Sequence, residues 1–135
     1  NKEKEVNVFG MPYRILASTE QTEGQYGLIE AAASKEVNSP HIHSNEDEAF
    51  YVLEGEVEFQ IGDETVTGIP GTFVRGPKGL THTFRGTSEK PSKLLILVAP
   101  GGFEGFFSEI DGLTDTEQVR SIASKYGLSY PDNLE

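Results

Sequence analysis

The sequence predicts an all-β protein, an antiparallel β-barrel or sandwich, with short helices at its C-terminus. Over residues 6–98, short apolar stretches alternate with polar residues and are separated by Gly, Pro, Asn and Asp, the pattern of strands joined by turns. The period changes after the breaker Pro100-Gly101-Gly102. A chain of 135 residues fits one domain with its own apolar core. We therefore expect a single domain over 1–135, with a barrel over about 6–98 and a helical tail over about 103–128.

The strands are clearest in the middle of the chain. Turn sequences at Glu54-Gly55 and Gly62-Asp63 separate the stretches EAFYVL, EVEFQI and ETVTG, which predicts a hairpin followed by a third strand. Three further stretches, GTFVRGPKG, HTFR and KLLILVA, supply more strands in chain order up to Ala99. Many short strands with frequent turns favour a closed barrel or a sandwich.

Two helices are predicted in the tail. FEGFFSEI forms a short one, and DTEQVRSIASKYG forms a longer one that begins with a capping box, Thr114-x-x-Glu117, and ends before Gly127. Helical spacing places four apolar residues on one side of the longer helix: Val119, Ile122, Ala123 and Tyr126.

Charge and composition exclude several functions. Eleven Lys and Arg against 22 Asp and Glu give a net charge of −11, which repels nucleic acid and anionic lipid, so neither is expected as a partner. The absence of cysteine excludes disulfides, thiolate metal sites and cysteine nucleophiles. No apolar run approaches the roughly 20 residues that span a bilayer, and no signal-peptide pattern opens the sequence, so we expect a cytoplasmic protein.

The three histidines of the chain lie at positions that can converge. His41 and His43 are one residue apart, so on a strand their side chains project from the same face. His82 begins the strand HTFR and shares its parity with Phe84, so it is expected to point inward. Two imidazoles on one side of a strand can share a metal ion.

Strand pairing places Glu48 with these histidines. A two-residue turn at Glu54-Gly55 sets Phe50 opposite Phe59 and Glu48 opposite Ile61, on the apolar face expected to point into the core. An unpaired carboxylate there would cost several kcal/mol or take up a proton. Glu48 therefore needs a partner, and His41 and His43 are close to it in sequence.

The neighbouring acids are assigned differently. Glu46 and Asp47 are expected to be solvated residues of a turn. Spacing alone leaves two interpretations of the four interior residues equally open: a metal site, or histidines with ordinary hydrogen bonds in a polar turn.

At this point the residues resemble the cupins. Pro40 to Gly55 contains His41-x-His43, four residues, Glu48, six residues and a glycine, which resembles the first cupin motif. Gly71, five residues, Pro77-x-Gly79, two residues and His82 resembles the second. The resemblance implies a small jelly-roll barrel in which His41, His43, Glu48 and His82 bind one divalent metal ion. Within the family, ligand spacing and the tail PGGFEGFFSEI resemble single-domain proteins similar to quercetin 2,3-dioxygenase.

Two positions depart from the family motifs. The first motif usually opens with glycine six residues before its first histidine, where this chain has Lys35. The second usually closes with asparagine four residues after its histidine, where this chain has Gly86. Neither position supplies a metal ligand in the family, so the predicted site is unaffected and the local turns are expected to differ.

The implied donor set suggests a chemistry. Three imidazoles and a carboxylate suit Fe, Mn, Co, Ni, Cu or Zn and suit Ca poorly. An open site on a redox metal suits dioxygen chemistry on an enol or enolate, and the resemblance implies that Glu48 acts as general base toward a substrate hydroxyl. The prediction is a dioxygenase acting on a small enolisable or phenolic, flavonol-like compound. The alternatives are an isomerase or decarboxylase using the same site, and a non-catalytic small-molecule-binding protein.

The pocket wall follows from strand parity. Phe50, Phe59, Phe73 and Phe84 are candidates to surround the metal and contact a planar substrate, with core packing as the alternative for each. Three phenylalanines of the tail are expected to close one barrel end: Phe103, Phe106 and Phe107. Arg75 and Lys78 are the cations nearest the second motif and are expected in solvated loops. A homodimer formed through an outer strand face is also expected from the family.

Overall fold

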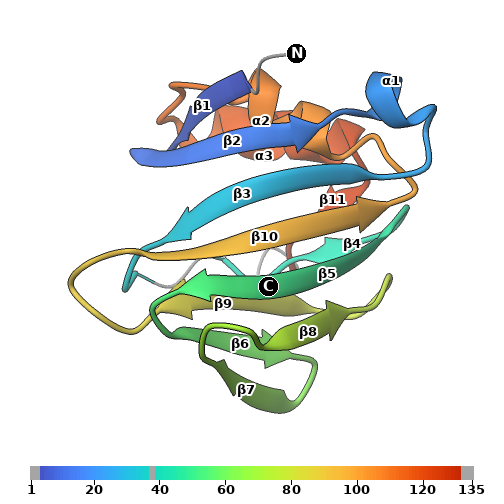
Figure 1. Ribbon diagram of the computed structural model, residues 1–135. Helices are drawn as coiled ribbons and strands as arrows, with labels where there is room; N and C mark the ends of the chain where they lie inside the picture. The colour runs from blue at the N-terminus through green and yellow to red at the C-terminus, as the bar shows by residue number, and fades with distance from the viewer. Residues whose placement is uncertain (1–3, 37–38, 132–135) are drawn as a thin grey trace.

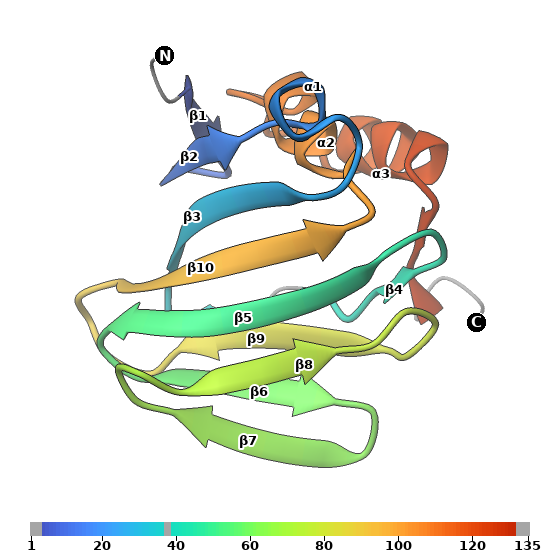
Figure 2. The ribbon, with the colours of Figure 1, turned by 45° about the vertical axis from the view of Figure 1, so that its right-hand side comes forward.

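The predicted all-β, antiparallel fold is confirmed. The computed structural model describes residues 4–36 and 39–131. The larger sheet has the order β1 (Lys4–Val8), β2 (Met11–Ala17), β3 (Gly27–Ala33), β10 (Ser92–Ala99), β5 (Asp47–Glu54) and β8 (Phe73–Gly76). A three-stranded sheet has the order β7 (Glu64–Gly68), β6 (Val57–Ile61) and β9 (His82–Gly86), and a two-stranded ribbon joins β11 (Leu128–Ser129) to β4 (Ile42–His43). Neighbouring strands are antiparallel throughout, and β5 and β8 lie over β9 and β6 as two facing layers (Figures 1 and 2).

The core fills the space between these layers. Phe50 and Val52 project from β5, and Val57 and Phe59 project from β6; all four side chains are buried. The rings of Phe50 and Phe59 meet with centroids 5.2 Å apart. Burying one such side chain contributes about 1.5–3 kcal/mol, so this contact between the layers is a main support of the barrel.

The hairpin register predicted for β5 and β6 is wrong. β5 pairs with β10 and β8, whereas β6 pairs with β7 and β9. Gly55, with φ +74°, turns the chain from one sheet into the other instead of into a hairpin. The inward-facing residues of both strands were nevertheless predicted correctly. Side chains alternate between the two faces of a strand whichever strand it pairs with, so the alternation does not depend on the register.

The two tail helices are confirmed as α2 (Glu104–Glu109) and α3 (Thr116–Lys125). α3 begins one residue later than predicted, because Asp115 rather than Thr114 is its N-cap and accepts hydrogen bonds from the next turn. Gly127 follows the helix with φ +80°, as expected of a C′ residue. Both helices lie at one end of the barrel, where α2 contacts β1 and β3, and α3 contacts α2 and β11 (Figure 2). β11 then pairs with β4.

One helix was not predicted. α1 (Thr19–Thr22) has four residues, too few to show a helical period, although Ser18 and Gln21 form a capping box at its start. The buried carboxylate of Glu104 accepts hydrogen bonds from Thr19 N at 2.5 Å and Gly102 N at 2.9 Å. This carboxylate therefore ties α1 to the start of α2. Within 4–36 and 39–131, no helix is long and apolar enough to cross a membrane.

Packing accounts for the glycine at position 86. Gly86 is buried on β9, its N–H donates to the Ser34 carbonyl at 2.7 Å, and a Cβ there would collide with the Ala33 carbonyl oxygen. No side chain fits, so the asparagine usual at this position of the motif is excluded. Lys35 is exposed after β3 and forms a surface ion pair with Glu89 at 2.8 Å.

Replacing Gly86 by alanine is expected to destabilise the barrel. The added Cβ forces β9 away from Ala33, an overpacking cost of about 1–3 kcal/mol in the free energy of unfolding. Urea denaturation followed by circular dichroism measures the change, with Thr67→Ala on the exposed face of β7 as the matched control, expected within about 0.5 kcal/mol of wild type. Equal midpoints for Gly86→Ala and wild type would contradict the packing argument.

Candidate metal centre

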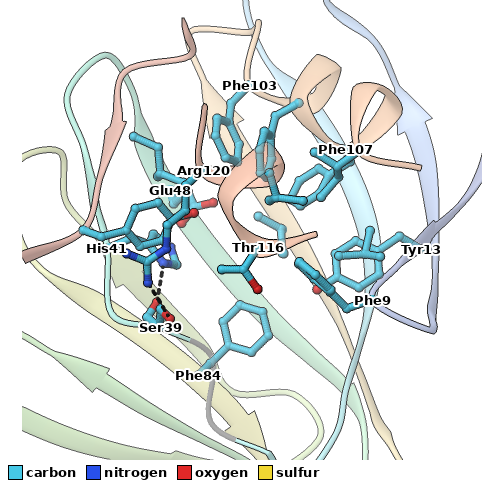
Figure 3. Close-up of a pocket in the computed structure, with 17 residues that line it drawn as sticks. Phe9, Tyr13, Ser39, His41, Glu48, Phe84, Phe103, Phe107, Thr116 and Arg120 are labelled. Atoms are coloured by element: carbon cyan, nitrogen blue, oxygen red, sulfur yellow. Dashed lines mark hydrogen bonds between the residues drawn. The ribbon is translucent and has the colours of Figure 1, made fainter. Parts of the chain in front are cut away.

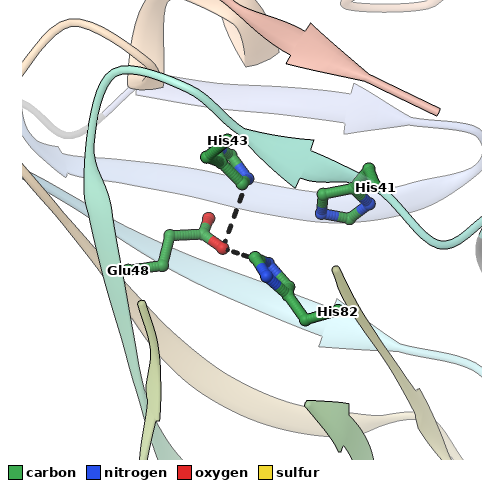
Figure 4. A group of neighbouring side chains, drawn as sticks. All are labelled: His41, His43, Glu48 and His82. Carbon is green, nitrogen blue, oxygen red and sulfur yellow. Dashed lines mark hydrogen bonds and ion pairs between the residues drawn. The ribbon is translucent and has the colours of Figure 1, made fainter. Parts of the chain in front are cut away.

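The structure brings together the four residues assigned to the interior. His43 lies on β4, Glu48 on β5 and His82 on β9, and His41 is held beside His82 by backbone hydrogen bonds of 3.0 and 2.9 Å. One ligand atom from each of the four lies within 4.8 Å of the others (Figure 4). Three strands from different parts of the chain therefore converge on one group of donors.

The imidazole rings are oriented by acceptors behind them. His41 Nδ1 lies 3.0 Å from the Ser39 carbonyl oxygen, and His43 Nδ1 lies 2.5 Å from Glu46 Oε2. Carbonyl and carboxylate oxygens accept hydrogen bonds, so the hydrogen is assigned to Nδ1 in both rings and the lone pair to Nε2. Metal-binding histidines are usually held in this way by a second hydrogen bond.

The contact between His43 and Glu48 is unfavourable unless a cation joins it. His43 Nε2 lies 3.3 Å from Glu48 Oε1, so a lone pair faces a carboxylate oxygen. Among the described residues, this nitrogen is the buried side-chain N or O atom that has no hydrogen-bond partner. A buried acceptor without a donor is costly, and a metal ion between the two atoms would satisfy both. The residues therefore fit a divalent metal.

His82 makes a different contact. Its Nε2 lies 2.6 Å from the same oxygen of Glu48, a hydrogen-bond distance, while its Nδ1 is 3.4 Å from the Leu80 carbonyl oxygen. In this arrangement the Nε2–H of His82 donates a hydrogen bond to the Glu48 carboxylate. Metal binding displaces protons from its ligands, so this proton occupies the position that a metal would take.

Electrostatics keep Glu48 and His41 in the forms that bind metal. Burial by itself would raise the pKa of Glu48, but His43, His82 and His41 together lower that pKa below its ordinary value. Burial, reinforced by His82 and His43, lowers the pKa of His41 to about 4 even though Glu48 opposes the shift. At neutral pH Glu48 is therefore ionised and His41 is neutral.

A largely apolar cavity opens beside this centre. It has a volume of ≈ 270 Å³ and is bordered by His41 and Glu48 on one side (Figure 3). Its aromatic wall comes from the turn after β1, from β2 and β9, from α2 and the residue before it, and from the residue after β11: Phe9, Tyr13, Phe84, Phe103, Phe106, Phe107 and Tyr130. An organic molecule in this cavity would touch the metal centre at one end and aromatic rings along its length.

The predicted pocket residues divide into three groups. Phe84 borders the cavity, whereas Phe50 and Phe59 are buried in the core and do not border it. Phe73 is 61 % exposed, so its assignment to the interior is wrong. Phe73 pairs with the outward-facing Tyr51, and it is its neighbour on β8, Val74, that points into the core.

The acidic residues also need one correction. Glu46 is 4 % exposed and bonded to His43, so its assignment to a solvated turn is wrong. The sequence did contain a signal for this contact, because Glu46 follows His43 by three residues. That spacing allows the two side chains to meet only if the turn between them follows one particular backbone path. Asp47 is exposed as predicted, and its carboxylate accepts a hydrogen bond from Lys78 N at 2.8 Å.

Several polar residues that border the cavity were not identified from the sequence, among them Tyr13 and Arg120. Tyr13 is buried on β2, and burial together with the nearby Glu48 raises the pKa of its phenol, so Tyr13 stays protonated. Arg120 reaches the cavity from α3. Neither residue has a local sequence signal, because both are separated from the motifs and meet them only through the fold. Arg75 and Lys78, the cations considered from sequence, are exposed.

The comparison with protein families agrees with this geometry. Residues 28–98 match the family described as "Cupin domain". The chain belongs to the cupin family.

Among characterised proteins, it is 30 % identical over 96 residues to quercetin 2,3-dioxygenase of Bacillus subtilis (strain 168). The match covers 70 % of this chain and 28 % of that enzyme, so the chain corresponds to less than a third of the relative's length.

Solved structures extend the similarity to the fold. KdgF from Halomonas sp. superposes with a TM-score of 0.64 at 21 % identity, covering 78 % of this chain and 91 % of that one. A deletion mutant of Bacillus subtilis oxalate decarboxylase OxdC superposes with a TM-score of 0.64 at 19 % identity, covering 76 % and 28 %. At these identities the superpositions establish a shared fold.

Proposed function

We propose that this cupin is a metal-dependent dioxygenase of a small enolisable or phenolic compound, with His41, His43, Glu48 and His82 as the metal ligands. The observation that carries the metal assignment is the buried, unpartnered Nε2 of His43 facing Glu48 at 3.3 Å. If these histidines only stabilised the fold, a hydrogen-bond donor would be expected to face Nε2 of His43. The similarity to quercetin 2,3-dioxygenase supports dioxygen chemistry, although this chain spans only part of that enzyme.

The residues of the site have separate tasks in this proposal. When bound, a divalent Fe, Mn, Co, Ni, Cu or Zn ion supplies Lewis acidity and, for the redox-active metals, access to dioxygen chemistry. Glu48 borders the cavity and is ionised, so it accepts the proton of a substrate hydroxyl. Tyr13 remains a neutral phenol and offers a hydrogen-bond donor to a substrate oxygen.

The cavity wall positions the substrate and limits water. Phe84, Phe103 and Phe107 present ring faces and edges that a planar compound can stack against. His43 itself packs edge-on against Phe103, with centroids 4.4 Å apart, which restricts rotation of this ligand. A flat, mostly apolar substrate therefore matches the cavity better than a sugar phosphate.

Dioxygen uptake tests the proposed reaction. We expect protein purified without added metal to carry a divalent ion by elemental analysis, and to consume dioxygen with a member of a panel of flavonols and diketones. Chelation is expected to abolish uptake and re-addition of the metal to restore it. If the protein is purified without metal and then takes up none of the six metals, the proposed metal site is refuted. Turnover that proceeds equally without dioxygen would instead indicate isomerisation or decarboxylation on the same residues.

A further inference from the structure

We propose that Phe9 contacts the substrate and selects for its size, with its ring as the wall of the cavity away from the metal centre. This proposal rests on the proposed function, in which the cavity beside the metal centre receives a flat organic compound. Phe9 then favours compounds that carry a second ring beyond the enol or phenol ring at the metal centre.

The position of Phe9 is the first observation. Its side chain borders the cavity and is 50 % exposed. Among the exposed large hydrophobic side chains of residues 4–36 and 39–131, that of Phe9 alone borders the cavity. Figure 3 shows Phe9 on the side of the cavity away from His41. A ligand that extends from the metal centre across the cavity would therefore cover this exposed ring.

The backbone of Phe9 is the second observation. Phe9 and Gly10 form the two-residue turn between β1 and β2, with φ of +50° and +86°. Positive φ at both central residues is the pattern of a type I′ turn, for which Asn-Gly is a preferred pair. A bulky residue with positive φ is strained, and asparagine adopts this conformation more readily. The turn by itself therefore does not account for a phenylalanine at this position.

Contacts with the rest of the protein hold the strained turn in place. The N–H of Asn7 donates to Asp111 Oδ1 at 2.7 Å, and the N–H of Gly112 donates to the Asn7 carbonyl oxygen at 2.9 Å. Within the turn, the N–H of Gly10 donates to Asn7 Oδ1 at 2.8 Å. The loop after α2 thus fixes the turn that carries Phe9. Strained residues persist where the surrounding structure holds them, and they cluster at ligand sites.

The size of the cavity indicates what the Phe9 ring contacts. The cavity has a volume of ≈ 270 Å³, whereas a cavity of about 150 Å³ is large enough to bind benzene. One ring at the metal centre therefore leaves space on the side of Phe9. A second flat ring fills that space and meets the Phe9 ring in an edge-to-face or offset-stacked contact.

Phenol and 2-naphthol are a matched pair of probes for this contact, because they share the hydroxyl-bearing ring and only 2-naphthol has a second ring. Each is titrated calorimetrically into the protein as purified, without dioxygen and with the metal content measured for every variant. Phe9→Leu, which removes the ring and keeps an apolar side chain, is expected to bind 2-naphthol about 3- to 10-fold more weakly, the size of one aromatic contact. Its affinity for phenol is expected to stay at the wild-type value.

Two further variants serve as controls for the ring and for its place. Phe9→Tyr keeps an aromatic ring in the turn and is expected to retain the wild-type affinity for 2-naphthol. Phe73→Leu removes another exposed phenylalanine, which does not border the cavity, and is expected to bind both probes as wild type does.

Phe9→Asn separates a role in binding from a role in folding. Because asparagine tolerates positive φ, this variant is expected to keep or raise the urea midpoint of unfolding while losing as much affinity for 2-naphthol as Phe9→Leu. A ring that only supported the fold would give the opposite pair of results, a lower midpoint and an unchanged affinity.

Wild-type affinity of Phe9→Leu for 2-naphthol, or no measurable binding of 2-naphthol to wild type, would overturn the inference. An equal loss of affinity for both probes, or a urea midpoint of Phe9→Asn below that of wild type, would assign the ring to the support of the fold and overturn it as well. The titrations involve no turnover. Absence of dioxygen uptake, which contradicts the proposed reaction, therefore leaves their outcome unchanged.

Discussion

Glu48→Gln and His43→Ala are each expected to weaken metal binding by more than about 100-fold, because each removes a donor from the four-residue centre. Changing even a partner of a ligand typically costs 10–100-fold in affinity, and loss of the ligand itself costs more. Glu48→Gln keeps the shape of the side chain while removing the negative charge that balances a divalent ion. His43→Ala removes the nitrogen that faces Glu48 at 3.3 Å.

Elemental analysis of the purified variants and calorimetric titration of metal-free protein with Co²⁺ or Zn²⁺ measure this loss. Asp47→Asn is the matched control: it alters the adjacent acid, which is exposed on the other face of β5, and is expected to bind metal as wild type does. Circular dichroism verifies that each variant remains folded. Wild-type metal content in both Glu48→Gln and His43→Ala would refute the ligand assignment.

Glu46→Ala is expected to lower metal affinity by about 10–100-fold without removing a ligand. Glu46 holds His43 through Nδ1 at 2.5 Å, so its loss frees the ring to rotate and leaves a buried N–H without an acceptor. Glu46→Gln keeps a neutral acceptor oxygen at nearly the same place. It is therefore expected to restore part of the affinity lost in Glu46→Ala.

The visible spectrum of the Co²⁺-loaded protein distinguishes this positioning role from a general loss of stability. Glu46→Ala is expected to change the spectrum, since the orientation of one ligand changes, whereas Asp47→Asn leaves it as in wild type. Identical affinities and spectra for wild type and Glu46→Ala would show that the acceptor behind His43 does not position it. If the spectrum of Glu46→Ala changed only as far as the fraction of unfolded protein explains, Glu46 would likewise have no role in positioning His43.

The alternation of residues along β5 and β6 was readable without a structure, but the partners of these strands were not. Phe50 and Phe59 were expected to be neighbours in one sheet and instead meet across the core with centroids 5.2 Å apart. Alternation depends on the extended backbone alone. Pairing depends on where the chain goes after Gly55, and a turn sequence is compatible with a hairpin or with a crossing between sheets.

The predicted burial of two residues was wrong, in opposite directions. Strand parity placed Phe73 inside, yet it is 61 % exposed. Glu46 was placed outside because it is acidic and lies in a turn, yet it is 4 % exposed. Residue type indicates an average preference for burial, and a partner such as His43 reverses that preference at a single site.

The antiparallel β class, the two tail helices and the interior placement of His43, Glu48 and His82 could be predicted from the amino-acid sequence. They follow from local periodicity and from the cost of burying an unpaired carboxylate. Tertiary structure alone decided which atoms meet. Glu46 reaches His43 through one particular backbone path of the turn between them, and Arg120 reaches the cavity through the placement of α3; neither follows from residue spacing alone.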